Sequence, residues 1–141
     1  MSSASQGHGF NWENDVRKMV FYLEEEKNNT DKYDIPKEKN KLNKNENVSL
    51  KSTGSECICT SDILRFYNYD FDNKNTIILI KYKQEGDNKI IENIYEINYS
   101  KNLHKILFGD LTEAEIINYV ENVKKIPPKI KGDEAKKYLI I

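Results

Sequence analysis

The chain has 141 residues, and its 22 lysines and arginines against 23 acidic residues give a formal net charge of −1. Apolar residues make up 38% of the sequence and aromatic residues 11%, which is too much for a disordered chain. The near-neutral charge excludes a general attraction to nucleic acids or membranes, so a site for either must be a local patch. A chain of this length is typical of one domain, and we expect a single domain over residues 1–141.

Targeting and redox signals indicate an intracellular protein. No stretch approaches the roughly 18 apolar residues of a membrane span. The start of the chain lacks the basic segment and apolar run of a signal peptide. Cys57 and Cys59 are separated by one residue, a spacing that rarely closes a disulfide and that lacks the second pair of a zinc site. We expect both cysteines to be small buried residues in a reducing compartment.

The first part of the chain predicts a helix, a short strand and a basic loop. Asn11 is a suitable N-cap, and apolar residues recur at helical spacing over residues 12–26. An apolar group at residues 33–35 predicts a brief strand before Pro36. Residues 37–46 are rich in lysine and asparagine and predict a solvated loop. Both residue types are abundant throughout, as in a gene rich in A and T, so one of them alone carries little information.

The rest of the chain alternates between strand and helix signals. Alternating or β-branched apolar residues predict strands at residues 48–52, 56–60, 76–83 and 89–99. Capped apolar patterns predict helices at residues 63–69 and 112–123, with a last helical turn after Gly132. The chain stops on an apolar turn, residues 138–141, as a C-terminally interrupted element would. These elements predict a mixed α/β fold, a central mixed sheet of about four to five strands flanked by helices.

Three residues form the most informative constellation: Glu13 on the first predicted helix, Asp34 on the brief strand and Lys51 on the next strand. Hydrolysis of a phosphodiester needs oxygen ligands for a hard divalent cation and a positive charge near the attacking water. A hairpin would bring Asp34 beside Lys51, with Ser49 on the same face. The ordinary alternatives stay open, because Glu13 could pair with Arg17, Asp34 could be a turn residue and Lys51 a surface lysine.

The order of short motifs resembles the PD-(D/E)XK nuclease superfamily. The segments that carry the resemblance are Gly9-Phe10-Asn11-Trp12-Glu13, then Asp34, then Asn47-Val48-Ser49-Leu50-Lys51-Ser52-Thr53-Gly54-Ser55, then Ser61-Asp62-Ile63-Leu64-Arg65-Phe66. The closest likeness is to type II restriction endonucleases and related nucleases of large DNA viruses, whose third core strand ends in a Ser-x-Lys form of the motif.

The resemblance implies a restriction-endonuclease-like fold, a Mg²⁺ cofactor, double-stranded DNA as substrate and a homodimer. It assigns metal binding to Asp34 and Glu13, with Asp62 as a nearby acid, catalysis to Asp34, Lys51 and Glu13, and a site-lining position to Ser49. Backbone contacts to DNA are expected from residues in the basic loop and around the predicted strands: Lys37, Lys39, Lys41, Lys44, Thr53, Ser55, Lys81 and Lys83.

Two departures from the pattern leave alternatives open. Ser49 stands where the family usually has an acid, and Tyr33 stands where it usually has proline before the aspartate. A catalytically inactive module that binds nucleic acid or protein on the same scaffold is therefore the main rival. A second register, with Asp62 as the first acid and Lys81 or Lys83 as the lysine, lacks a carboxylate two residues before either lysine.

Overall fold

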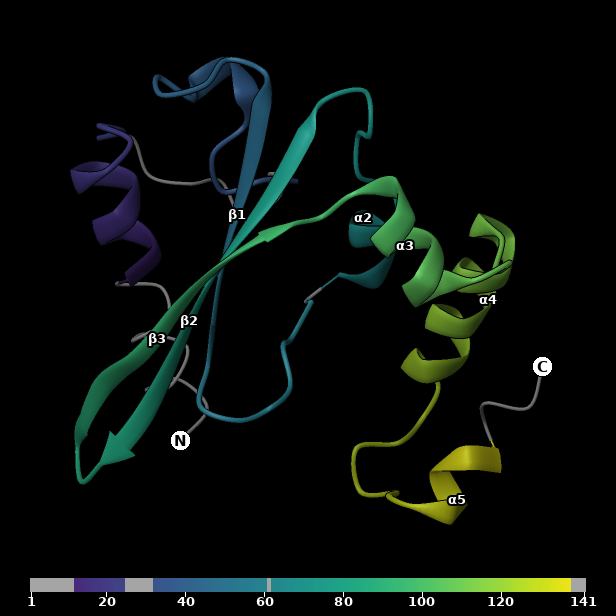
Figure 1. Ribbon diagram of the computed structural model, residues 1–141. Helices are drawn as coiled ribbons and strands as arrows, with labels where there is room; N and C mark the ends of the chain where they lie inside the picture. Colours follow the sequence, from purple (N-terminus) through teal and green to yellow (C-terminus); the bar gives the residue numbers. More distant parts are fainter. Residues whose placement is uncertain (1–11, 25–31, 61, 138–141) are drawn as a thin grey trace.

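The computed structural model describes residues 12–24, 32–60 and 62–137 (Figure 1). Residues 12–19 are helical. The elements after them are the 3₁₀ helix η1 (Lys37–Lys39), β1 (Glu46–Thr53), α2 (Ile63–Tyr67), β2 (Lys74–Glu85), β3 (Asn88–Asn98), α3 (Lys101–Phe108), α4 (Glu113–Lys124) and α5 (Asp133–Lys136).

Three strands form one mixed sheet in the order β1-β2-β3 within the described residues. β1 and β2 are parallel and are joined through α2, whereas β2 and β3 form an antiparallel hairpin. The fold is therefore mixed α and β as expected, but its sheet has fewer strands than the four to five predicted. The brief strand at residues 33–35 is reduced to one antiparallel bridge between Ile35 and Val48.

The strand predicted at residues 56–60 is absent, because side-chain hydroxyls occupy its backbone groups. Thr53 Oγ1 donates to the carbonyl of Cys57 at 2.6 Å, and the N–H of Cys57 donates to Ser55 Oγ at 3.2 Å. Such local bonds compete with a strand ladder. The segment forms a loop in which Cys57 and Cys59 are both exposed, so the expectation that they are buried was wrong.

The sheet lies between two helical layers (Figure 1). On one face, Val16 of the first helical segment packs with Phe21 against a small core of Ile35, Val48 and Leu50. On the other face, helices α2 to α4 cover a larger, mainly aromatic core. Its buried members are Tyr33, Phe66, Tyr69, Ile77, Tyr99, Phe108 and Ile116.

The first helix and α3 depart from the sequence prediction. The first helical run ends at residue 19, and residues 20 and 21 form a turn, although the apolar pattern predicted a helix to residue 26. Residues 25 and 26 lie outside the described part. Helix α3 was not predicted; its N-cap is Ser100, whose side chain accepts a hydrogen bond from Leu103 N at 3.2 Å. Helix α4 has the predicted capping box between Thr112 and Glu115.

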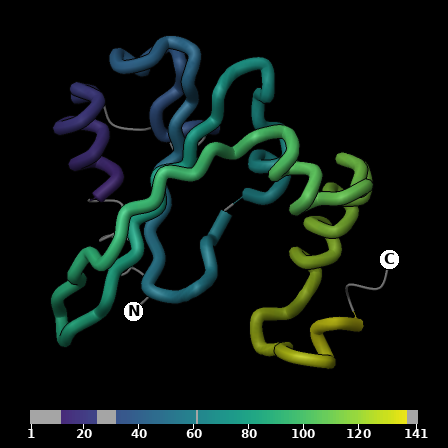
Figure 2. The backbone as a smooth tube through the Cα atoms, viewed as in Figure 1, coloured from purple at the N-terminus to yellow at the C-terminus, as the bar shows by residue number. Residues whose placement is uncertain are grey.

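The β2–β3 hairpin extends beyond the end of β1 (Figure 2). The pairing of β1 with β2 stops at Lys81, and a β-bulge follows between Lys81 and Tyr82 in the β2–β3 ladder. Trp12 packs edge-on against Tyr82, with ring centroids 5.3 Å apart, so the start of the first helix supports the base of this projection.

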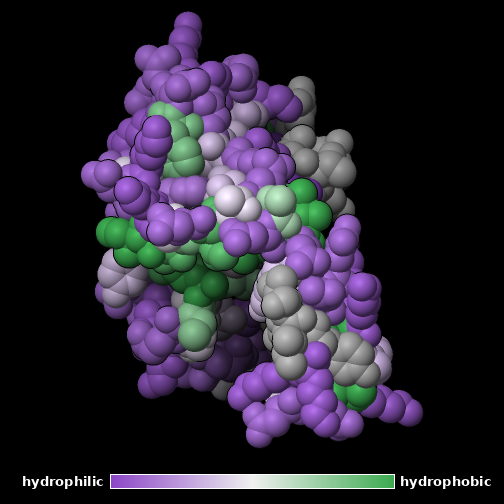
Figure 3. Space-filling model, turned by 90° about the vertical axis from the view of Figure 1, so that its right-hand side faces the viewer, coloured by the Kyte–Doolittle hydropathy of each residue, from purple (hydrophilic) through white to green (hydrophobic). Residues whose placement is uncertain are grey.

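The face that carries α3 and α4 has apolar side chains gathered in a band beside a hollow (Figure 3). A cavity of about 450 Å³ lies here, and its lining is mainly apolar with Glu115 at its edge. No helix in the described ranges is both long and apolar enough to cross a membrane.

Phe66 lies at the centre of the aromatic core, with its ring against those of Tyr69, Tyr99 and Phe108. We predict that Phe66→Ala lowers the free energy of unfolding by about 3–5 kcal/mol, because it removes buried surface and leaves a cavity. Met19→Ala, at a side chain that is 76% exposed, should change it by less than about 0.5 kcal/mol. Urea denaturation followed by circular dichroism measures both, and equal losses would contradict the assignment of this core.

Candidate functional site

Asp34 lies at the edge of β1 that faces away from β2. The residue is 3% exposed, and its Oδ2 accepts a hydrogen bond from Leu50 N at 2.6 Å. The chain turns here, since Tyr33 enters the aromatic core and Ile35 the smaller core on the other face. Ile35 exchanges two backbone hydrogen bonds with Val48, and the Asp34 carboxylate continues that ladder by one position. The structure therefore places Asp34 against the residue that precedes Lys51, as the predicted hairpin required.

Ser49 and Lys51 share the face of β1 that looks toward α2. Val48 and Leu50 belong to the core on the opposite face, and side chains alternate along a strand. Ser49 is buried, and its hydroxyl is 2.8 Å from the hydroxyl of Tyr69. Lys51 is half-buried, and within the described part of the chain no hydrogen bond or ion pair involves its amine. Its positive charge is therefore available to a bound group.

Tyr69 closes the aromatic core over Ser49. Burial raises the pKa of Tyr69 to about 12, and the nearby charge of Asp34 acts in the same direction, while the hydrogen bond with Ser49 opposes the shift. An acid in place of Ser49 would be desolvated beneath this ring, whereas the serine hydroxyl is satisfied by its contact with the Tyr69 hydroxyl. Tyr69 belongs to the site, and no sequence motif indicated it.

Glu13 and Asp62 do not join Asp34 in a metal-binding group. No three His, Cys, Asp or Glu side chains among the described residues are arranged to hold a metal ion. Glu13 is half-buried on the helical segment that covers the Leu50 face, so it lies on the other side of the sheet from Lys51. Asp62 is the N-cap of α2, where its Oδ1 accepts from Leu64 N and Arg65 N.

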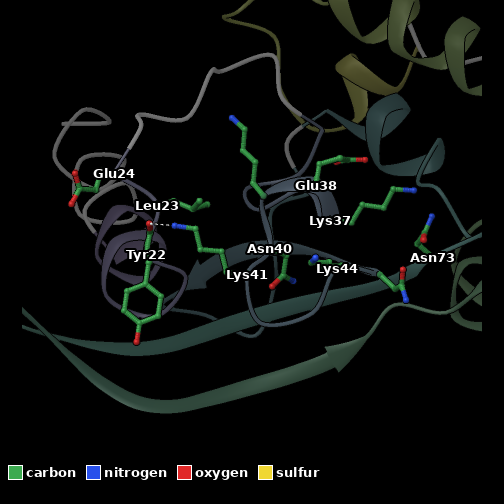
Figure 4. A pocket seen from close by; sticks show the side chains of 11 residues that line it. Tyr22, Leu23, Glu24, Lys37, Glu38, Asn40, Lys41, Lys44 and Asn73 are labelled. Carbon is green, nitrogen blue, oxygen red and sulfur yellow. Dashed lines mark hydrogen bonds between the residues drawn. The ribbon is translucent and has the colours of Figure 1, made fainter.

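The four lysines of the predicted basic loop line one open cavity of about 1090 Å³ (Figure 4). We call it the basic cleft; its lining residues are Tyr22, Leu23, Glu24, Lys37, Glu38, Lys39, Asn40, Lys41, Lys44, Asn45 and Asn73. Lysines outnumber glutamates four to two in this lining, although the whole chain has a net charge of −1. Positive charge is therefore concentrated locally in this cleft.

Buried asparagines fix the wall of the basic cleft. The Asn40 side chain donates to Glu46 O and accepts from Leu42 N and Asn43 N, which closes the loop onto the start of β1. Asn47 Oδ1 accepts from Lys37 N at 2.8 Å and so attaches η1 to the same strand. The cleft is preformed, which lowers the ordering cost of binding. Because asparagine is so common in this chain, no sequence pattern singled out Asn40 or Asn47.

The other predicted DNA contacts lie at the opposite end of β1, roughly 25 Å away for a strand of 8 residues. Lys81 forms an ion pair with Glu56 that raises the pKa of its amine, and Lys83 lies 3.7 Å from Glu85. Thr53 is committed to the Cys57 carbonyl, while Ser55 is exposed. The structure thus divides the predicted contacts into two groups, one at each end of the strand that carries Lys51.

Comparison with protein-family models, with curated proteins and with solved structures found no match.

Three buried tyrosines predict a loss of stability at high pH. Burial raises the pKa of Tyr33, Tyr69 and Tyr99, so the folded state keeps protons that the unfolded chain releases near pH 10. The stability that Tyr69 contributes is complete below about pH 10 and is lost as the pH rises toward about 12. One titrating group can contribute at most about 1.4 kcal/mol per pH unit to such a slope.

Urea denaturation at a series of pH values tests this expectation. Tyr69→Phe should show a shallower loss of stability above pH 10 than the wild type, because it removes one of the groups. Tyr119→Phe, at an exposed tyrosine of α4, is the matched control and should keep the wild-type slope. Identical slopes for wild type and Tyr69→Phe would contradict the assignment.

Proposed function

We propose that this chain is a metal-dependent endonuclease that hydrolyses phosphodiester bonds in DNA. The observation that carries the proposal is the hydrogen bond from Leu50 N to the Asp34 carboxylate, because Leu50 directly precedes Lys51, and Asp34 and Lys51 are the two residues that resemble the PD-(D/E)XK motif. The order of elements supports it, since the Ile35 bridge, β1, α2 and the parallel β2 follow one another around this point.

The distribution of charge gives independent support. The basic cleft lies at one end of β1 and Lys81 and Lys83 at the other, so lysines flank the Asp34–Lys51 position on both sides. Exposed ion pairs such as Lys37 with Asp70, at 3.7 Å, contribute little to stability and can be exchanged for phosphate. A DNA strand that follows β1 would be held on each side of the bond to be cut.

In the proposed reaction, water attacks phosphorus and the bond to the leaving oxygen breaks. Lys51 orients or activates the water and offsets negative charge on the phosphate, while Ser49 lines the site. Asp34 is the proposed protein ligand of Mg²⁺, which would supply Lewis-acid stabilisation of that charge when bound. Mg²⁺ takes one or two carboxylates together with water and phosphate oxygens, so a group of three acids is not required.

A catalytically inactive nucleic-acid-binding module is the second candidate, and a specific observation favours it. Asp34 is buried and accepts from Leu50 N, and the Ser49 hydroxyl is engaged by Tyr69. Both groups thus have structural roles that would remain without catalysis. The two candidates share the basic cleft and differ only in whether magnesium-dependent cleavage accompanies binding.

Asparagine and alanine substitutions test the catalytic proposal. Asp34→Asn retains an oxygen to accept from Leu50 N, and we predict that it keeps most of the stability but lowers magnesium-dependent plasmid cleavage by about a hundredfold or more. Lys51→Ala should lower cleavage to a similar extent with little loss of plasmid binding. Asp133→Asn on α5 and Lys101→Ala on α3, both exposed, are matched controls. Binding without cleavage by the wild type would instead establish the inactive module.

Salt dependence tests the basic cleft. A lysine that contacts phosphate should lower the slope of log K against log salt concentration by about 1 when it is replaced by alanine. We predict this change for Lys44→Ala and for Lys39→Ala, and none for Lys124→Ala at the exposed end of α4. Fluorescence anisotropy with a labelled oligonucleotide at several salt concentrations measures the slopes. An unchanged slope in both cleft variants would show that these lysines do not contact phosphate.

A further inference from the structure

Tyr22 has an unusual backbone conformation at the edge of the basic cleft. Its φ is 58°, which makes it the one non-glycine residue with positive φ in the described ranges. A left-handed residue commonly ends a helix, and here Leu23 N donates to Arg17 O at 2.8 Å around it. Such positions usually hold glycine, so a tyrosine here has a conformational cost. The conformation is held by contacts around it, including a hydrogen bond from Lys41 Nζ to Tyr22 O at 3.3 Å.

The side chain of Tyr22 is 63% exposed, although its neighbour Phe21 is buried in the small core. Figure 4 shows Tyr22 at one end of the cleft and Lys37 with Asn73 at the other, with Lys41 and Lys44 between them. Tyr22 also lines a second, smaller cavity with Lys18 and Glu24, so there is open space beside it on two sides. The turn that ends the first helix thus presents an aromatic ring to solvent at the end of a row of lysines.

We propose that the basic cleft binds an unpaired stretch of nucleic acid, with the ring of Tyr22 stacked on a base and the cleft lysines on the neighbouring phosphates. This inference rests on the proposed function, since it assumes that the ligand is nucleic acid. Sites for single strands combine these two elements, a positively charged groove and an aromatic side chain on which a base stacks.

The geometry favours an unpaired base over an intact duplex. Within a duplex both faces of a base are covered by its neighbours, so an aromatic ring can stack only on a base that is terminal, flipped out or single-stranded. Asn45 and Asn73 also line the cleft, and Asn73 lies at its far end beside Lys37. Glu24 and Glu38 also line the cleft and oppose phosphate, so they limit where the backbone can run.

Oligonucleotide binding measured by fluorescence anisotropy tests the proposal. The probes are a short single strand, its duplex, and the same single strand with abasic sites. Wild-type protein should prefer the intact single strand over the duplex. Tyr22→Ala should weaken single-strand binding by about tenfold, in the range expected for loss of one stacked base, and Tyr22→Phe should retain it. For the abasic strand, wild type and Tyr22→Ala should bind equally.

Two further variants separate stacking from folding and from general surface effects. Tyr22→Gly removes the ring but suits the positive φ, so its melting temperature should equal or exceed that of the wild type while its single-strand binding falls about tenfold. Tyr119→Ala removes an exposed tyrosine from α4, outside the cleft, and should bind as the wild type does.

The inference is overturned if the wild type binds single strand no better than duplex, if Tyr22→Ala binds the intact strand as the wild type does, or if abasic sites make no difference. Plasmid cleavage is measured with the same preparations. Cleavage without Tyr22-dependent binding overturns this inference and retains the nuclease proposal. Tyr22-dependent binding without cleavage supports this inference and overturns the nuclease proposal.

Discussion

The parallel pairing of β1 with β2 is the constraint on which the rest of the structure depends. Its register places Asn47 opposite Asn75 and Ser49 opposite Ile77, and the two asparagine side chains are both buried, with Nδ2 and Oδ1 3.4 Å apart. A slip by one residue would exchange the two faces of the strand, so Lys51 would enter the apolar core that now holds Leu50. The slip would also separate the buried side chains of Asn47 and Asn75, which hydrogen-bond to each other, so these two residues help to fix the register.

From this register, β1 organises both candidate sites. Its free edge receives the Asp34 carboxylate, one face carries Ser49 and Lys51, and its first residues anchor the loop of the basic cleft. The same strand therefore sets the separation between the cleft and the position where hydrolysis is proposed. Glu13 is attached to a different layer, on the far face, and its distance from Asp34 depends on how the first helix packs rather than on the sheet.

The sequence predicted what depends on periodicity and local caps. The strand at residues 76–83, the hairpin after it and the helix after Thr112 were all found, because each carries its own pattern. The approach of Asp34 to β1 was also predicted, from the hairpin. The early end of the first helix and the loop at Cys57 were not, because tertiary packing and hydroxyl–backbone bonds overrode propensity there. The role assigned to Tyr69 rests on its hydrogen bond with Ser49, and the role assigned to Tyr22 on its backbone angle and position. Residue spacing in the sequence predicts neither.

Asp34 has a structural role at the edge of β1 as well as its proposed role in catalysis, and this has an evolutionary consequence. Because its carboxylate completes the edge of β1, selection for folding alone would retain an aspartate here even in a lineage that had lost hydrolysis. Lys51 has no such tie, since no hydrogen bond or ion pair within the described residues holds its amine, and it would be free to drift once catalysis ceased. Among relatives of this chain, variation at Lys51 rather than persistence of Asp34 would therefore record whether the proposed activity was kept or lost.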